Sequence, residues 1–279
     1  MLRVLKAGFY TTVQDSGRFH YRNKGVPVSG VMDEISVFKV NSLLENDVSS
    51  SVLEITMTGP KLVFEKETYI VLGGAILSAK LNNLPIQNYK VYQIKMGDKL
   101  SFGGLEKGFR SYLGVKGGFT SKNVLGSKSF YKPITKFNRL TDNDVVPYVP
   151  TKLFQPKISE IKVDSFLEET VLEVSIGPEF DLLNDRQLED IFSKSFTVAH
   201  ENNRMAYQLS ETIKPHKMSM LTSATIPGTV QCTPAGKLIV LMKDGQTTGG
   251  YPRVVQLTDK AICILAQKKG GDTISFKLV

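Results

Sequence analysis

The chain has 279 residues, of which 41% are hydrophobic and 22% charged, the composition of a globular protein with enough apolar residues for a buried core. Its formal net charge of +8 comes largely from scattered lysines, without an arginine-rich helix or an aromatic RNA-binding motif, so surface lysines explain the charge better than nucleic-acid binding. The two cysteines and three histidines lack zinc-type spacing, and no apolar run is long enough to span a bilayer, so we expect a cytoplasmic protein without a metal site or membrane segment.

The first distinctive segment, "TTVQDSGRFHYRNKGVPVSGVMD", covers residues 11–33 and is too irregular to be read as a strand. A loop of this length is usually functional or disordered. Arg18 could clamp a carboxylate or phosphate, and Asp15 and Ser29 are further polar candidates. The alternative is a surface loop with a local pair between Asp15 and Arg18, and the residues alone leave both interpretations open.

A helix is predicted next, in "SGVMDEISVFKVNSLLEN", where Asp33 can act as the N-cap. Its apolar positions, Ile35, Phe38, Val40, Leu43 and Leu44, roughly fit a period of 3.6 residues. β-type runs bounded by turn residues follow at 61–65, 68–74, 98–104 and 110–118.

The run at 110–118 ends in Lys116, Gly117 and Gly118, within "FRSYLGVKGGF". Glycines at a strand end permit positive φ and let a ligand approach the backbone, so Gly117 and Gly118 are candidate binding residues. The alternative, an ordinary turn, is the more frequent case for such a pair.

Residues 141–165 are interpreted as a linker, because Pro147, Pro150 and Pro156 stand there among polar residues. The predicted domains are therefore 1–145 and 165–279. Echoes of "LEITMTGPKLVF" in "LEVSIGPEFDLL", and of "GDKLSF" in "GDTISF", form a weak repeat that suggests two related β-domains.

The second half repeats the β pattern, with runs at 172–177, 237–242, 261–267 and 272–278. A short helix is predicted in "DRQLEDIFSK", with Leu188, Ile191 and Phe192 as its apolar stripe. Both helices are short enough to close one end of a barrel. The close spacing of the β-type runs favours antiparallel barrels or sandwiches, so the fold class is mainly β.

Two polar stretches of the second half complete the candidate residues. In "HENNRMAYQL", Asn203 and Arg204 precede a strand-like run. In "LMKDGQTTGGYPRV", about ten residues replace an ordinary hairpin turn. There Asp244 could act as a base, Gln246 and Thr247 offer donors and acceptors, Gly249 and Gly250 offer backbone N–H groups, and Tyr251 could stack on a ligand. The alternative is a packed turn in which Asp244 caps local N–H groups and Tyr251 is buried.

Several well-known motifs do not occur in the sequence. It contains no GxxxxGK[ST], GxSxG, HExxH or GxGxxG, and the Met-Lys pair in "VLMKDG" lacks the Met-Lys-Met of a biotin acceptor. From its residues alone, the chain is a two-domain β-protein with polar, glycine-rich loops.

The same stretches together resemble a known family. "TTVQDSGRFHYRNKGVPVSGVMD", "LEITMTGPKL", "RSYLGVKGGF", "VLGSKS", "NNRMAYQL", "VQCTPAGKLIVLMKDGQTTGGYPRV" and "GDTISF" are similar, in order, to the allophanate hydrolase subunit 2 family. That family is also called the biotin-dependent carboxyltransferase family, and it includes the C subunit of 5-oxoprolinase and KipA-like regulators.

The resemblance implies two cyclophilin-like β-barrel domains and a role as the C subunit of an ATP-dependent 5-oxoprolinase. The implied partners are the A and B subunits of that enzyme. The B subunit is in the allophanate hydrolase subunit 1 (KipI-like) family. ATP would be used by the complex. The implied substrate is a small amide, which a site recognises by pairing both its carbonyl and its N–H. In this interpretation Asp244, Tyr251, Arg18 and Asp15 are the catalytic candidates.

Two alternatives to the 5-oxoprolinase role stay open. A KipA-like regulator would bind and antagonise an inhibitor of a histidine kinase, and the polar loops would then be a docking surface. A carboxyltransferase acting on urea-type amides would need biotin-carrier and carboxylase domains that other subunits supply.

Overall fold

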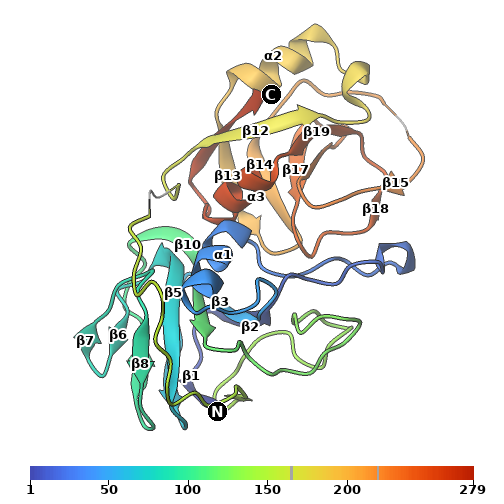
Figure 1. Cartoon of the computed structure of the whole chain (residues 1–279). Coiled ribbons are helices and arrows are strands. Elements are labelled where there is room, and N and C mark those ends of the chain that lie inside the picture. Colours follow the sequence, from blue (N-terminus) through green and yellow to red (C-terminus); the bar gives the residue numbers. More distant parts are fainter. Residues whose placement is uncertain (164–165, 219) are drawn as a thin grey trace. The chain divides into compact units, whose positions relative to one another are not determined.

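The computed structural model describes residues 1–163, 166–218 and 220–279 (Figure 1). Its contacts divide the chain into two compact units, one of residues 1–18 and 29–168 and one of residues 19–28 and 169–279. The domain boundaries predicted from the sequence remain a prediction. Residues 164–165, where the predicted linker ends and the predicted second domain begins, lie outside the described residues.

The first unit contains two antiparallel sheets. One has the strand order β11 (Val145–Val146), β1 (Leu2–Lys6), β4 (Lys61–Phe64), β9 (Lys99–Ser101), β6 (Lys80–Leu81) and β7 (Leu84–Pro85). The other has the order β2 (Tyr10–Gln14), β3 (Val52–Thr56), β10 (Lys107–Val115), β5 (Thr68–Ile76) and β8 (Tyr92–Ile94). The start of the segment interpreted as irregular from residue 11 is thus strand β2, which pairs with β3 from Tyr10↔Thr56 to Gln14↔Val52.

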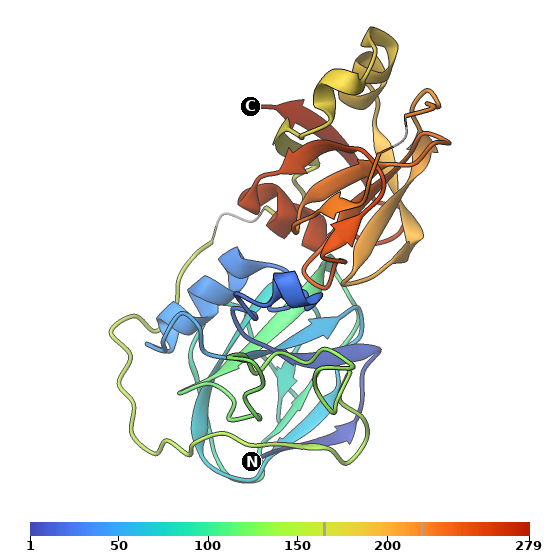
Figure 2. The ribbon, with the colours of Figure 1, turned by 90° about the vertical axis from the view of Figure 1, so that its right-hand side faces the viewer.

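Apolar side chains from both sheets meet in one core. Leu2, Leu62 and Phe64 come from the first sheet, and Val13, Ile55 and Leu113 from the second, and all are fully buried. The alternation of apolar residues along these strands places them on the inner faces. Figure 2 shows the ribbon of this unit, with its strands arranged around the interior.

Helix α1 (Glu34–Leu43) covers the outer face of the second sheet (Figure 1). Asp33 is its N-cap, as predicted, and accepts a hydrogen bond from Ser36 N–H. The helix buries Val37, Val40 and Leu43, whereas Phe38, predicted for the apolar stripe, is 57% exposed. The buried face of the helix is therefore rotated relative to the apolar stripe that was predicted from the sequence.

The segment interpreted as a linker packs along the first unit. Its residues 145–146 form β11, which pairs with β1, and Lys90 and Glu160 form a bridge. Val146 and Tyr148 are buried, at 2% and 5% exposed. The prolines interrupt the strands here, but the segment stays packed on the first unit because apolar residues near the prolines reach its core.

The strands of the second unit close into a barrel. In order they are β12 (Val171–Ile176), β19 (Arg253–Leu257), β16 (Thr229–Cys232), β17 (Lys237–Leu241), β14 (Ala206–Thr212), β13 (Phe196–Asn202) and β20 (Thr273–Leu278). The parallel pairing of β12 with β20 closes the ring. A two-stranded ribbon, β15 (Ser223–Ala224) with β18 (Thr248–Gly249), lies outside it.

Helix α2 (Asp185–Ser193) forms where it was predicted, with a capping box of Asn184 and Gln187. Short 3₁₀ turns occur at η1 (Arg22–Lys24) and η2 (Phe180–Leu182). No helix among the described residues is long and apolar enough to cross a membrane.

The strand predicted at 261–267 is wrong. Residues Asp259–Ala266 form helix α3, whose N-cap Thr258 accepts a hydrogen bond from Ala261 N–H. The helix is buried on nearly all sides, so its residues show no polar stripe, and a short apolar run of this kind cannot be told from a strand by periodicity. The mainly β fold class is nevertheless confirmed, with a closed barrel in the second unit.

Candidate functional site

The carboxylate of Asp15 organises the loop after β2. It accepts hydrogen bonds from the N–H groups of Gly17 (2.9 Å) and Lys128 (2.6 Å) and from the hydroxyls of Ser127 and Ser129 (2.6 Å each). Asp15 is 8% exposed. Because its oxygens already have these four donors, the geometry favours a positioning role for Asp15 over proton transfer.

Arg18 holds the same loop from the other side. The residue is fully buried, its Nε donates to the carbonyl of Val124 at 3.2 Å, and its Nη2 donates to the carbonyl of Ser129. A buried guanidinium that binds two carbonyls fixes the backbone between them. Asp15 and Arg18 therefore brace residues 124–129, which the sequence did not connect with either side chain.

Ser29 lies at a tight turn against this loop. Its φ is +56°, and its buried hydroxyl has no hydrogen-bond partner among the described residues. At the next position, Gly30, a Cβ would come within 2.9 Å of the backbone of residues 16–17, so only glycine fits. The turn is further held by Val31 N–H, which donates to the carbonyl of Asp15 at 2.9 Å.

A buried polar network lies at the N-terminus of α1, and sequence reasoning identified only Asp33 of it. Glu54 accepts hydrogen bonds from Met32 N–H (2.8 Å) and the hydroxyl of Tyr112 (3.1 Å), and that hydroxyl accepts from Asp33 N–H (2.9 Å). Arg110 Nε is 3.8 Å from Glu54 Oε1. Burial raises the pKa of Tyr112 well above its ordinary value, so the hydroxyl stays protonated as a donor. Glu54 and Arg110 are charged residues inside apolar strand runs, and this pattern in the sequence could have identified them.

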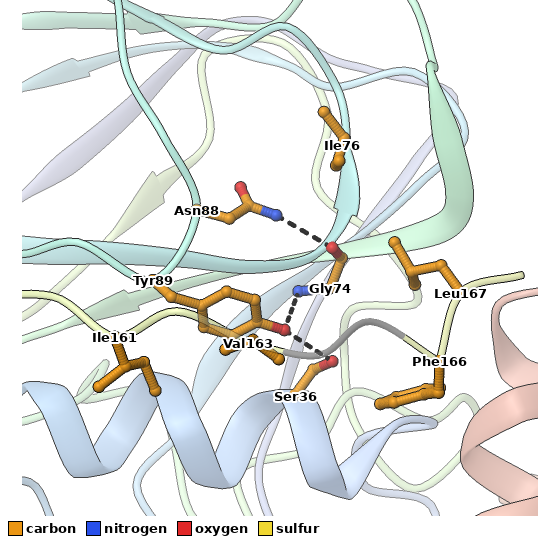
Figure 3. Close-up of a pocket in the computed structure, with 9 residues that line it drawn as sticks. All are labelled: Ser36, Gly74, Ile76, Asn88, Tyr89, Ile161, Val163, Phe166 and Leu167. Carbon is orange, nitrogen blue, oxygen red and sulfur yellow. Dashed lines mark hydrogen bonds between the residues drawn. The ribbon is translucent and has the colours of Figure 1, made fainter.

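A pocket of about 220 Å³ lies next to this network, and Figure 3 shows the residues that line it. The hydroxyl of Tyr89 accepts from Gly74 N–H (2.9 Å) and donates to Ser36 Oγ (3.1 Å). Phe166 and Leu167 are part of its apolar wall. Burial raises the pKa of Tyr89, which keeps its hydroxyl protonated. Because these hydroxyls already bind each other, the pocket offers mainly apolar surface and suits an amide poorly.

Gly117 and Gly118 belong to the turn after β10. Gly117 N–H donates to Asn46 Oδ1 (2.7 Å), and Gly118 N–H donates to the carbonyl of Val115 (2.9 Å). The neighbouring Lys116 Nζ donates to the carbonyl of Leu44 at 2.7 Å, at the C-terminal end of α1. With both N–H groups occupied, this geometry favours a structural role for the two glycines.

In the second unit, Arg204 and Asp244 form a bidentate ion pair. Arg204 Nε and Nη2 lie 2.8 Å and 3.1 Å from the two oxygens of Asp244, and the side chains are 6% and 13% exposed. The backbone reinforces the pair, since Asp244 N–H donates to the carbonyl of Arg204 at 2.8 Å. Asn203 caps the turn, accepting from the N–H groups of Met205 and Ala206. The structure thus joins two predicted residues that lie 40 positions apart.

A second side-chain contact of this loop joins two glutamine amides. Gln246 Nε2 lies 3.4 Å from Gln231 Oε1, and Gln231 Nε2 donates to the carbonyl of Tyr251 at 3.3 Å. Gln231, which the sequence reasoning missed, is buried in β16 and 1% exposed. A Cβ at Gly249 would lie 2.3 Å from Gln231 Nε2, so the amide pair requires a glycine there.

The rest of the loop is open. Tyr251 is 41% exposed, Gln246 and Gly250 are exposed, and a Cβ on Gly250 would meet nothing closer than 4.0 Å. The loop is fixed through its backbone, because Thr225 N–H donates to the carbonyl of Thr247 (3.0 Å) and Thr225 Oγ1 to that of Gln246 (2.6 Å). The packed-turn alternative with a buried Tyr251 therefore does not describe this loop.

The end of the loop is anchored by Arg253. Its Nε and Nη2 lie 2.9 Å and 2.6 Å from the oxygens of Glu179, and its Nη1 donates to the carbonyl of Ala224 at 2.6 Å. These hydrogen bonds from Arg253 lower the pKa of Glu179. Arg22, from the segment 19–28 of this unit, donates to the carbonyl of Thr225.

The predicted residues thus fall into two groups. Asp15, Arg18, Ser29, Gly117 and Gly118 belong to the first unit, and all but Ser29 are held in internal hydrogen bonds. Asn203, Arg204, Asp244, Gln246, Thr247, Gly249, Gly250 and Tyr251 belong to the second unit and form one continuous loop cluster. This cluster, with Gln231 added, is the candidate site.

Comparison with known proteins matches residues 24–278 to the model of the carboxyltransferase domain, subdomains A and B. The chain is 32% identical to the C subunit of 5-oxoprolinase from Escherichia coli strain K12, over 99% of this chain and 90% of that protein. The crystal structure of TTHA0988 superposes with a TM-score of 0.89 at 26% identity, and this chain spans 55% of that one. The Kluyveromyces lactis urea carboxylase gives a TM-score of 0.88 at 28% identity, and this chain spans 27% of it.

Proposed function

Since the chain belongs to the family of carboxyltransferase domains with subdomains A and B, as its resemblance to the allophanate hydrolase subunit 2 family implied, we propose that it is the C subunit of an ATP-dependent 5-oxoprolinase. In this role it acts with the A and B subunits to open 5-oxoproline to glutamate. The observation that carries the proposal is the 32% identity to a protein named as the C subunit of 5-oxoprolinase, along nearly the whole of both chains.

The loop cluster of the second unit suits a small cyclic amide. Gln246 presents an exposed primary amide, and an amide can pair with another amide through one donor and one acceptor. Tyr251 supplies an exposed ring and hydroxyl on the same loop. Buried Gln231 orients Gln246, and Arg204 holds Asp244, so the binding groups are fixed before a substrate arrives.

Asp244 acts in this proposal as an orienting group. Both of its oxygens are bound by Arg204, which makes it a poor acceptor for a substrate proton. Negative charge that develops on the amide oxygen during ATP-dependent activation would instead need N–H donors, which Gln246 and the loop backbone can provide. In this proposal ATP is used at the level of the complex that the chain forms with the A and B subunits.

The direct test combines the chain with the A and B subunits of 5-oxoprolinase and follows glutamate release from 5-oxoproline. We expect release that requires ATP and all three proteins. The A and B subunits must first be shown to be competent with the C subunit from E. coli, which serves as the positive control. A competent pair that releases no glutamate with this chain would contradict the proposal.

The loop cluster is tested in the same assay with Tyr251→Ala and Gln246→Ala. Loss of a charge-stabilising donor costs about 100-fold in rate, whereas an exposed side chain changes stability by within about 0.5 kcal/mol. We therefore expect strongly reduced turnover at an unchanged melting temperature. Met205→Ala, an exposed residue on the neighbouring turn, is the matched control. Full activity of both loop variants would remove this loop from the site.

A second candidate is carboxyl transfer to a urea-type amide, favoured by the structural similarity to the K. lactis urea carboxylase. The same amide-binding loop would then take urea, and a carboxylated biotin carrier would supply the carboxyl group. The two functions are distinguished by incubating the chain with urea and with a biotin carrier whose carboxyl group is labelled. Label transferred to urea supports the second, and label retained on the carrier contradicts it.

A further inference from the structure

A second pocket lies in the first unit, at the end of the loop that Asp15 and Arg18 brace. It has a volume of about 290 Å³, near the lower end of the range for small-molecule sites. Its apolar lining includes Val124, Phe130, Phe137, Leu140, Val146 and Pro147. None of these residues belongs to the loop cluster assigned to the amide substrate.

An aromatic wall gives the pocket its shape. The rings of Phe130 and Phe137 are stacked, with centroids 5.7 Å apart and an angle of 27° between the planes. Phe137 is 44% exposed, so part of its ring is free to contact a ligand. Ligand pockets are lined predominantly by hydrophobic and aromatic side chains, and an aromatic ring favours offset stacking with another flat ring.

Charge at the pocket is the second independent feature. Lys122 and Lys136 both line it, and neither forms an ion pair with a described residue. Lys136 Nζ lies 5.4 Å from the centroid of the Phe137 ring, which puts a cation next to the exposed aromatic wall. The third charged lining residue, Asp144, has one oxygen bound to Thr141 N–H (2.7 Å) and hydroxyl (2.9 Å). The lining therefore carries two cations and one partly satisfied anion, which matches a ligand with a single negative charge.

The pocket is also built on a fixed frame. Val124 begins the braced loop, and Arg18 binds its carbonyl. Phe130 directly follows the loop, and its N–H donates to the carbonyl of Val13 (2.9 Å). Thr135 holds the backbone of Phe137 in the same aromatic wall, donating from its hydroxyl to the carbonyl of Phe137 at 2.7 Å. A wall held in this way needs little reordering when a ligand binds.

We propose that this pocket binds a small organic monocarboxylate with a flat apolar body. The apolar body stacks on Phe137 inside the pocket, and the carboxylate lies at Lys136 and Lys122. The pocket lining shares no residue with the loop cluster, and the proposal does not rest on the function proposed above.

The test measures binding of naphthalene-2-carboxylate to the full chain by isothermal titration calorimetry, with naphthalene-2-methanol as the neutral analogue. We expect the carboxylate to bind about fivefold more tightly, the size of a partly exposed ion pair. Lys136→Gln should remove most of this preference. Lys132→Gln, an exposed lysine of the same segment outside the pocket, should leave it unchanged.

Phe137→Ala should weaken both probes by about tenfold, because it removes the stacking surface. Thermal melts run beside the titrations show whether Phe137→Ala is folded. If it is not, Lys136→Gln still tests the pocket, because it changes an exposed side chain. The proposal is overturned if neither probe binds at millimolar concentration, if both bind equally, or if Lys136→Gln behaves like Lys132→Gln.

Discussion

At the scale of single residues, two adjacent glycines of the candidate loop have different reasons to be there. Neither has a positive φ, so conformational freedom explains neither of them. Gly249 leaves room for the amides of Gln231 and Gln246, which a Cβ would approach to 2.3 Å and 2.9 Å. Gly250 faces open space, and a side chain there is free to point outward. A larger residue at Gly250 therefore meets no steric obstacle, and Gly249 is the glycine that the site requires.

This contrast gives a paired prediction. Gly249→Ala should destabilise the protein by about 1–3 kcal/mol, as overpacking does, and should reduce activity by displacing the two amides. Gly250→Ala should change the free energy of unfolding by less than about 0.5 kcal/mol. Chemical denaturation of the two variants beside the wild type measures both values. Equal destabilisation would show that the amide pair is not held as described.

The ion pair of Glu179 with Arg253 predicts a pH dependence. The hydrogen bonds of Arg253 lower the pKa of Glu179 below its ordinary value of 4.5. A carboxyl with a lowered folded-state pKa stabilises the protein above its unfolded-state pKa, and this contribution is lost as the pH falls through the folded-state value. Glu179→Gln should therefore lower the melting temperature at pH 7, and the gap to wild type should narrow below about pH 4.5. Melting curves from pH 7 to pH 3 test this, and a gap that stays constant would exclude the linkage.

At the scale of elements, glycines set how closely α1 approaches its sheet. A Cβ on Gly114 of β10 would lie 2.5 Å from Val40 Cγ1, and one on Gly73 of β5 would lie 2.5 Å from Val40 Cγ2. Val40 thus occupies the space that these two strands leave open. The close approach buries Val40 completely and brings the N-terminal turn of α1 onto the Glu54 and Tyr112 network.

A double-mutant cycle tests this packing. Gly114→Ala should destabilise the protein by about 1–3 kcal/mol, because the added methyl meets Val40. Val40→Ala should also destabilise it, through lost burial. The double variant should be more stable than the two separate effects predict by about 1 kcal/mol, since Val40→Ala leaves the space that the methyl group added at residue 114 fills. Additive effects would mean that the helix shifts as a whole and that Val40 is not the point of contact.

The elements also show what the sequence could and could not predict. Seven of the eight predicted β-type runs are strands and the first two helices form as predicted, because alternation and N-cap residues such as Asp33 and Asn184 are local signals. Helix α3 was missed because burial on all sides removes the polar stripe that marks a helix. Its Thr258 cap was the available signal, and it was outweighed by the β-branched and apolar residues that follow.

The candidate site was predicted unevenly for a similar reason. Polar residues gathered in one glycine-rich loop, such as Gln246 and Tyr251, are visible as a local pattern. Gln231 sits inside an ordinary strand and joins them only through the pairing of β16 with β19. Asp15 and Arg18 were recognised as unusual, yet their partners at 124–129 are more than 100 positions away, and no local pattern reveals such a contact.

At the scale of the whole molecule, neither of the two units is one continuous stretch of the chain. Residues 19–28 interrupt the first unit in sequence and belong to the second, where Arg22 binds the carbonyl of Thr225. The chain therefore passes from the first unit to the second after residue 18, returns after residue 28, and passes again after residue 168. A cut at the last passage leaves residues 19–28 on the N-terminal fragment while their packing partners are on the C-terminal fragment.

This arrangement predicts that such a cut does not separate the fragments. With a protease site inserted after Glu168, the cleaved protein should elute from a size-exclusion column as one species under native conditions, because the second unit still needs the segment 19–28. Tethering through this segment should depend on its anchor, so Arg22→Ala should favour release of the C-terminal fragment after cleavage. Lys24→Ala, on the same 3₁₀ turn but exposed, is the control that should leave the fragments together. If the wild-type fragments elute apart immediately after cleavage, residues 19–28 are not an integral part of the second unit, and the chain divides at residue 168 alone.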